Sequence, residues 1–168
     1  MTDHGATPRS LPRWAALLVM AGVIAADQLT KHEAARLLLE GDRHSYLGDV
    51  LRLELARNPG AFLGLGARLP QAVRTGVFTW GVAALVLWTL WIALVRRPAL
   101  LHALGAGLVA AGGIGNLWDR LVAGGLVIDF LNFGIGPLRT GIFNVADLAI
   151  VAGVVLLALP VRPSTSSG

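Results

Sequence analysis

The 168-residue chain contains no cysteine, and only 14% of its residues are charged. The absence of cysteine excludes disulfides, thiolate nucleophiles and cysteine-ligated zinc sites. Soluble domains carry about 25% charged residues, whereas this chain is 55% hydrophobic and has a mean hydropathy of +0.66. The composition therefore predicts one small domain of membrane helices, spanning residues 1–168, without a second domain.

Histidine and serine are too scattered to suggest a metal site or a serine hydrolase. The histidines show neither a His-Glu-x-x-His pattern nor another close ligand cluster. No serine in or beside an apolar segment has a histidine near it. We therefore predict no metal site. The histidines are His4, His32, His44 and His102.

Basic residues are in excess, but they are not arranged for nucleic acid. The formal net charge is +4 and the sequence pI is about 11.0. The arginines occur singly or as the pair Arg96-Arg97 beside apolar runs, rather than in a basic stripe. Residues 105–110 loosely match a dinucleotide fingerprint, yet no predicted strand precedes them. The sequence predicts neither a nucleic-acid partner nor a nucleotide site.

Apolar segments organise the chain. Twenty helical residues, at about 1.5 Å each, cross a hydrocarbon core of about 30 Å. The first segment also fits a cleaved signal peptide, because residues 14–26 are short and end in small side chains. The sequence predicts spans at about 14–30, 76–95, 99–118 and 140–161.

The second and third segments should form a membrane hairpin, because only Pro98 separates them after the arginine pair. By the density of Lys and Arg in short connections, the hairpin tip and both termini are cytoplasmic. The long connection 31–68 holds a similar number of basic residues, so the raw count does not decide the orientation.

The 31–68 connection should form a small extracytoplasmic subdomain. Leu51–Leu55 alternates strictly between apolar and polar residues, which predicts a half-buried strand and a small sheet. Residues 32–40 resemble a short amphipathic helix, and Asn58-Pro59-Gly60 predicts a turn. We expect a flexible lid within this segment and a disordered tail at 163–168.

The third span carries a stripe of small residues at every fourth position, which lets helices approach closely in lipid. The stripe is Ala103, Gly107, Ala111 and Gly115.

Polar residues gather at the opposite end of the third and fourth spans. Antiparallel spans bring the end of one and the start of the next to the same membrane face, so these residues can converge. Ionisable residues near a bilayer are costly and mark functional sites, and Asp129 with Asp147 suggests a carboxylate pair. Structural alternatives also exist for these residues. Asp119 and Arg120 could form a neutral ion pair. Asn116 and Asn144 could be helix caps, and Asp147 could be a first-turn acid that the helix dipole favours. The set is Asn116, Asp119, Arg120, Asp129, Asn144 and Asp147.

Five ordered motifs, within about residues 14–160, resemble the signature of lipoprotein signal peptidases, the type II signal peptidases of bacteria. The family often has Asn-x-Gly-Ala-Ala-Phe where this chain is one alanine shorter, so Phe62 is given no role. The motifs are Asp27-Gln28-Leu-Thr-Lys31, Asn58-Pro-Gly60-Ala61-Phe62, Asn116-Leu-Trp-Asp119-Arg120, Val127-Ile-Asp129-Phe130 and Phe143-Asn144-Val-Ala146-Asp147.

The resemblance implies roles for these residues. Asp129 and Asp147 would be the catalytic aspartates, and Asn58 and Arg120 would hold the substrate. Asp27 and Lys31 would be structural and tie the first span to the extracytoplasmic sheet. The remaining implied roles are supporting, for Asn116, Asp119 and Asn144, and structural, for Gly60.

The resemblance further implies a four-transmembrane-helix bundle with a small extracytoplasmic β-sheet and a short amphipathic helix. The implied substrate is a diacylglyceryl-modified prolipoprotein, cut before its lipidated cysteine. The implied location is the bacterial inner membrane, in contact with its lipids, with the active site near the extracytoplasmic face. The two-carboxylate chemistry that the resemblance implies needs no cofactor. Inhibition by globomycin-like cyclic peptides is also implied.

Two other classes remain open. A proton-coupled transporter or channel would place its acids near mid-span and often shows an internal repeat. A non-catalytic assembly factor could use the 103–115 stripe to bind partner helices.

Overall fold

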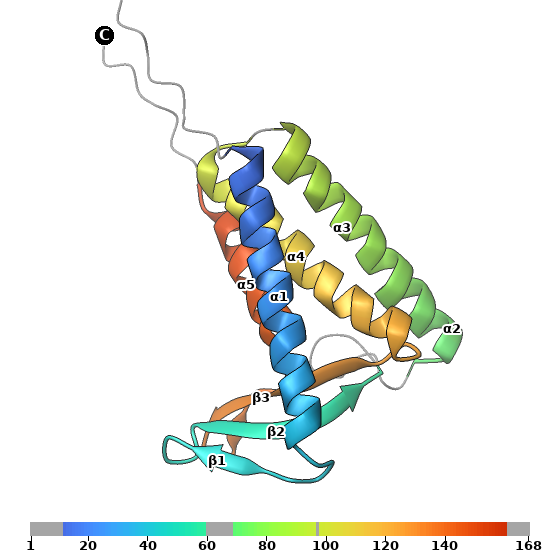
Figure 1. Cartoon of the computed structure of the whole chain (residues 1–168), viewed down its shortest axis with the longest axis vertical. Coiled ribbons are helices and arrows are strands. Elements are labelled where there is room, and N and C mark those ends of the chain that lie inside the picture. The colour runs from blue at the N-terminus through green and yellow to red at the C-terminus, as the bar shows by residue number, and fades with distance from the viewer. Residues whose placement is uncertain (1–11, 60–68, 97, 161–168) are drawn as a thin grey trace, which may run out of the picture.

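The computed structural model describes residues 12–59, 69–96 and 98–160. Helices form a bundle, and a small sheet lies across one of its ends (Figure 1). The beginning of α1 and the end of α5 lie at the other end of the bundle. The helical elements are α1 (Arg13–Leu37), α2 (Gln71–Arg74), the π-helical η2 (Thr75–Gly81), α3 (Val82–Trp91), the π-helical η3 (Ile92–Arg96), α4 (Leu100–Val122) and α5 (Val145–Ala158). The strands are β1 (His44–Tyr46), β2 (Leu51–Asn58), β3 (Val127–Ile135) and β4 (Leu138–Arg139).

Within the described residues, three helices are long and apolar enough to cross a membrane: Arg13–Leu37, the continuous run Gln71–Arg96, and Leu100–Val122. They match the first three predicted segments. The fourth is shorter than predicted, because α5 has 14 residues and starts at Val145 rather than Thr140. Phe143 forms a bridge with Leu131 instead, which keeps the chain before Asn144 extended.

The separate amphipathic helix predicted for 32–40 is wrong. Helix α1 continues without a break to Leu37. Between Gly22 and Gly41 the chain has neither glycine nor proline, so nothing in the sequence ends the first helix near Thr30. The extra turns carry α1 onto the sheet, where Ala34 and Leu38 pack with Leu55 and Phe130.

Helix α4 contacts α1, α3 and α5, and small residues on two of its faces permit this. The predicted stripe is buried and faces α1: a Cβ at Gly107 would meet Met20 at 3.6 Å. A second set, which the sequence analysis did not identify, faces α5. A Cβ atom on Gly105 would lie 2.8 Å from the carbonyl oxygen of Gly153. A Cβ atom on Gly112 would overlap the carbonyl oxygen of Ala146. Side chains there would force α4 and α5 apart.

The sheet is antiparallel with the order β1-β2-β3-β4. Half of its strands come from Val127–Arg139, so it is not built from the 31–68 connection alone. Strand β2 extends past the predicted 51–55 to Asn58, the first residue of the predicted turn. Gly60, Phe62, residues 60–68 of the segment that was expected to hold a lid, and the 163–168 tail lie outside the described residues.

Candidate functional site

Five of the predicted site residues converge on one cavity of ≈ 410 Å³. They come from four elements that are distant in sequence: β2, the last turns of α4, β3 and the first turn of α5. The site therefore exists only once the sheet has closed over the end of the bundle (Figure 1). These residues are Asn58, Asn116, Arg120, Asp129 and Asp147.

Asp147 is placed by the cap of α5. The Asn144 side-chain oxygen accepts a hydrogen bond from the Asp147 backbone N–H at 3.0 Å, and Asp147 Oδ2 accepts one from the Asn144 N–H at 3.4 Å. This reciprocal pair is a capping box, which satisfies N–H groups that a helix start leaves open. Two of the predicted structural alternatives are therefore correct: Asn144 is a helix cap, and Asp147 is a first-turn acid. They do not remove Asp147 from the cavity.

Asp129 is placed by strand alternation on β3. Successive side chains of a strand point to opposite faces, and the next residue, Phe130, packs in the core with α1. Asp129 faces the cavity instead, where Asn58 Nδ2 donates to its Oδ2 at 2.9 Å. Asn144 Nδ2 donates to its Oδ1 at 2.6 Å.

Two amides link the aspartates into one network. Asn116 Nδ2 donates to Asp147 Oδ1 at 2.8 Å. Asn144 Nδ2 donates both to Asp129 and, at 3.1 Å, to Asn116 Oδ1. Neither amide carries a charge, so the network holds the two carboxylates in place without neutralising them.

The environment raises the pKa of Asp129 to about 6 from an ordinary value of 3.8, chiefly through burial. The Asp147 carboxylate acts in the same direction, whereas the hydrogen bonds from Asn58 and Asn144 and the charge of Lys31 act against it. A carboxyl group with this pKa exchanges protons near neutral pH, as acid–base catalysis requires.

A buried ion cluster lies behind the cavity. Lys31 is 2% exposed, and its Nζ lies 2.8 Å from Asp27 Oδ2, 2.9 Å from Asp119 Oδ2 and 3.0 Å from Asn116 Oδ1. An ammonium group has three donors and no acceptor, so the Asn116 oxygen must face Lys31 and its nitrogen must face Asp147. Lys31 therefore sets the orientation of the amide that holds an aspartate.

The cluster also shows what Asp119, Asp27 and Lys31 contact. Asp119 forms its ion pair with Lys31 rather than with Arg120. Asp27 and Lys31 join α1 to α4 and to the start of α5, where Ala146 N donates to Asp27 at 2.9 Å. The link to the sheet runs through Asp119, whose Oδ2 accepts from the Ile128 N–H at 3.1 Å.

Arg120 is held differently. Its Nη1 donates to the Asn116 carbonyl oxygen at 3.2 Å, and its guanidinium lines the cavity. Within the described ranges it forms no ion pair, so its fork of donors remains available beside the two aspartates. In the same part of the chain, no group of three or more His, Asp or Glu side chains is arranged to hold a metal ion.

Sequence reasoning missed two parts of this site. Gln28 was noted only as a motif residue, but its Nε2 donates to Asp27 at 3.1 Å and to Asp119 at 3.0 Å. The apolar wall of the cavity was not anticipated, because no sequence pattern distinguishes residues facing a groove from those facing lipid. The wall consists of Phe78, Val82, Gly113, Val127, Ile150, Val151, Val154 and Val155.

Comparison with known proteins agrees with this geometry. A family model described as Signal peptidase (SPase) II matches residues 19–161. The chain belongs to this family. It is therefore a member of a family of membrane proteases.

Individual relatives and structures are similar over most of the chain. It is 40% identical over 142 residues to the lipoprotein signal peptidase of Pelotomaculum thermopropionicum, covering 84% of this chain and 87% of the relative. It is 36% identical over 147 residues to that of Methylocella silvestris, covering 87% and 84%. A solved structure described as a bacterial membrane enzyme superposes with a TM-score of 0.78 at 25% identity, covering 90% of each chain.

Proposed function

We propose that the chain is an aspartyl endopeptidase that removes signal peptides from diacylglyceryl-modified prolipoproteins by cutting before the lipidated cysteine. The observation that carries the proposal is the convergence of Asp129 and Asp147, both buried, in one cavity that Arg120 also lines. The relatives named lipoprotein signal peptidase support the substrate class.

Two adjacent carboxylates provide an acid and a base together, because like charges in one site favour sharing a single proton. The ionised member takes a proton from water, and the resulting hydroxide attacks the scissile carbonyl carbon. The protonated member gives its proton to the carbonyl oxygen. When the C–N bond breaks, the leaving amine takes the proton that came from water, and one hydroxyl of the tetrahedral intermediate gives its proton to the other carboxylate. This leaves a carboxylic acid product and restores the single shared proton. The balance of protons needs no cofactor.

The polar residues around the pair divide into two kinds. Arg120 can hold a substrate carbonyl or carboxylate with a planar pair of donors, and Asn58 stands at the cavity edge next to Asp129. Asn116, Asn144 and Asp119 orient the catalytic groups and do not react.

The apolar wall suits the signal helix of such a substrate. From the aspartates, the cavity extends along Ile150, Val151, Val154 and Val155 of α5, opposite Phe78 of η2. An apolar helix lying there would bring its carboxyl end to the two carboxylates. Ligand sites of this kind combine an apolar lining with a few placed polar groups.

The depth of the site fits a bond at the membrane interface. His102 Nε2 lies 3.0 Å from the Leu159 carbonyl oxygen, so the start of α4 and the end of α5 are level with each other. Asn116 follows His102 by 14 residues, which is about 21 Å along a helix. With His102 at one surface of a core of about 30 Å, Asn116 lies about 9 Å below the other surface. The Asp147 carboxylate, which accepts from Asn116, lies at the same depth. We assign the sheet to the extracytoplasmic side of the inner membrane and regard α5 as the fourth span.

Two observations weigh against the other classes. The acids lie at the sheet end of the helices, not near mid-span as in a transporter. The 103–115 stripe is buried against α1, so an assembly factor could not offer it to partner helices without opening the bundle.

The direct test compares a lipid-modified prolipoprotein with the same precursor lacking the lipid, each incubated with the purified protein. Mass spectrometry should find cleavage of the modified precursor only, with the lipidated cysteine as the new first residue. Binding without cleavage would contradict the proposal. Loss of cleavage with a metal chelator would contradict the aspartyl mechanism.

A further inference from the structure

The hairpin between β3 and β4 exposes aliphatic side chains where water-facing hairpins carry polar ones. Ile135 is 78% exposed and Leu138 is 81% exposed, the highest values among the large hydrophobic residues in the described ranges. They flank the two-residue tip, Gly136-Pro137. Contiguous exposed apolar surface marks contact with a membrane or with a protein.

These residues belong to a larger patch. Val50 and Phe133, both exposed, line a hollow of ≈ 460 Å³ together with Ile135 and Leu138. The Gly134 N–H donates to the Val50 carbonyl oxygen at 2.9 Å, which joins the β1–β2 turn to the hairpin. The patch is therefore one surface built from two turns.

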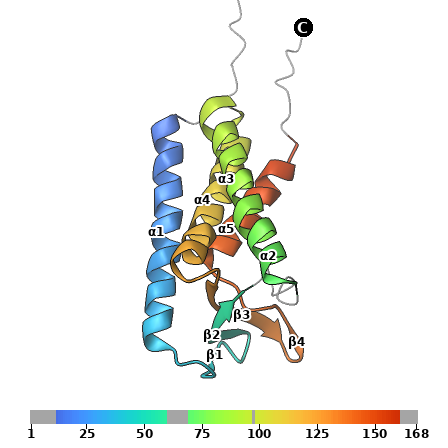
Figure 2. The same ribbon diagram turned by 90° about the vertical axis from the view of Figure 1, so that its right-hand side faces the viewer.

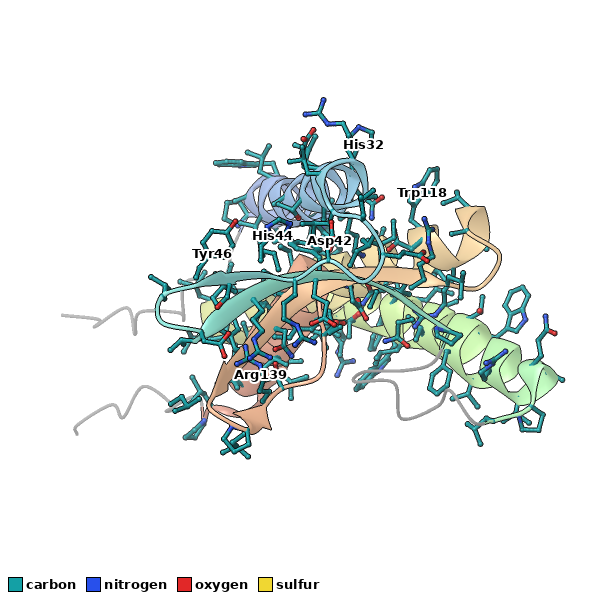
Figure 3. All side chains as sticks on the ribbon, turned by 90° about the horizontal axis from the view of Figure 1, so that it is seen from below. His32, Asp42, His44, Tyr46, Trp118 and Arg139 are labelled. Atoms are coloured by element: carbon teal, nitrogen blue, oxygen red, sulfur yellow. The ribbon has the colours of Figure 1, made fainter. Side chains whose placement is uncertain are left out.

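The base of the hairpin is rigid and carries net positive charge. Arg139 Nη1 donates to the Asp49 carbonyl oxygen at 2.8 Å, and Arg52 pairs with the Asp49 carboxylate. Two arginines share one aspartate there. In Figure 3, which looks at the sheet end, Arg139 lies on the side of the sheet away from α1. An aliphatic tip on a cationic base is the composition of surfaces that enter the lipid interface.

The position of the patch selects lipid over a protein partner. Strand β4 is followed after five residues by α5, whose Leu148 is exposed at the bundle surface. With 14 residues, α5 covers about 21 Å of a core of about 30 Å. Because α5 ends level with the start of α4, the part of the hydrocarbon core that α5 does not cover lies at the sheet end of the bundle. Figure 2 shows β3 and β4 below the helices, with β4 on the side away from α1.

We propose that the β3–β4 hairpin docks on the outer leaflet, with Ile135 and Leu138 inserted between the headgroups and the acyl chains. Asp129 lies on the same strand, six residues before Ile135. Docking thus fixes the height of an active-site strand relative to a substrate that is itself anchored in lipid. This consequence rests on the proposed function, whereas the docking itself does not.

The absence of cysteine makes the docking directly measurable. Leu138→Cys and the control Asp42→Cys each give one site for a nitroxide spin label in the full chain, reconstituted in phosphatidylethanolamine–phosphatidylglycerol vesicles. Asp42 is exposed and lies in the connection between α1 and β1. The label at 138 should collide more with dissolved oxygen than with a water-soluble nickel chelate, and the label at 42 should show the reverse. Equal preference for the nickel chelate at both positions would overturn the proposal.

A second measurement tests the consequence. Leu138→Asn should slow cleavage of lipid-modified precursor about tenfold in vesicles and leave the rate in detergent micelles unchanged. Leu39→Asn, which alters another exposed leucine, should change neither rate. An equal loss in vesicles and micelles would show that the hairpin acts through folding rather than through lipid. The spin-label result needs no catalysis, so it stands even where the proposed function fails.

Discussion

Lys31 should control the rate through Asn116, and this can be tested without leaving buried charge behind. Lys31→Met alone removes the only cation of a cluster in which Asp27 and Asp119 are both buried. Breaking a buried ion pair costs about 3–5 kcal/mol, so that variant should fold poorly. The triple change Asp27→Asn, Lys31→Met and Asp119→Asn removes all three charges and avoids this cost.

The magnitude follows from the bond that Lys31 orients. With the ammonium gone, nothing compels the Asn116 oxygen to face away from Asp147, and the 2.8 Å bond from its nitrogen is no longer enforced. A hydrogen bond to a charged group contributes about 1.5–3 kcal/mol. At about 1.4 kcal/mol per tenfold, the cleavage rate of the triple variant should fall about 10- to 100-fold.

The assay is cleavage of lipid-modified precursor by variants that are matched for insertion and thermal stability. In a background of Asn116→Ala, the triple change should cost almost nothing more, because both act on one interaction. Gln28→Leu is the control: within the described residues, the Gln28 amide donates to Asp27, to Asp119 and to the Gly115 carbonyl oxygen rather than to Asn116. This variant should lower stability and leave the rate intact. A triple variant with full activity, or losses that add in the Asn116→Ala background, would refute this reasoning.

Further changes probe the other parts of the site. Arg120→Lys keeps the charge but loses the planar fork, so cleavage should fall while the protein still inserts; an undiminished rate would show that only charge matters there. Because burial raises the pKa of Asp129 from 3.8 to about 6, the folded state binds more protons than the unfolded state in this window. Thermal stability should therefore fall by up to about 3 kcal/mol as the pH rises through it, and Asp129→Asn should flatten that curve. Gly112→Ala would press on the Ala146 carbonyl oxygen and should cost about 1–3 kcal/mol in thermal unfolding, whereas Gly22→Ala, with open space around it, should not destabilise the protein.

The sequence predicted the helices better than the sheet, because helices leave a local signal. Charge-free runs of 20 residues located the second and third long helices, and antiparallel connection was enough to predict that Asp129 and Asp147 line one site. Strand β3 was not predicted, since its partner β2 lies about 70 residues away and its apolar residues do not differ from those of a span. The start of α5 was misplaced because a bridge from Phe143 to Leu131 overrides the apolar pattern there.

The role of Lys31 was hidden for a related reason. A lysine near the end of a span ordinarily extends its ammonium toward water. Only the fold shows that Lys31 is buried and that its third donor reaches Asn116, 85 residues away. Contacts of this range require the packing of α1 on α4 to be known.

The central claim is that Asp129 and Asp147 act as one catalytic unit, and the cleavage rates of Asp129→Asn, Asp147→Asn and the double variant test it most directly. Each single change keeps the size of the side chain and removes its acid–base function, so each should lower the rate at least about 10²–10⁴-fold. The double variant should be hardly slower than either single one. Asp119→Asn, outside the cavity lining, should retain measurable turnover under the same conditions. Substantial cleavage by Asp129→Asn or Asp147→Asn in folded, inserted protein would contradict the account.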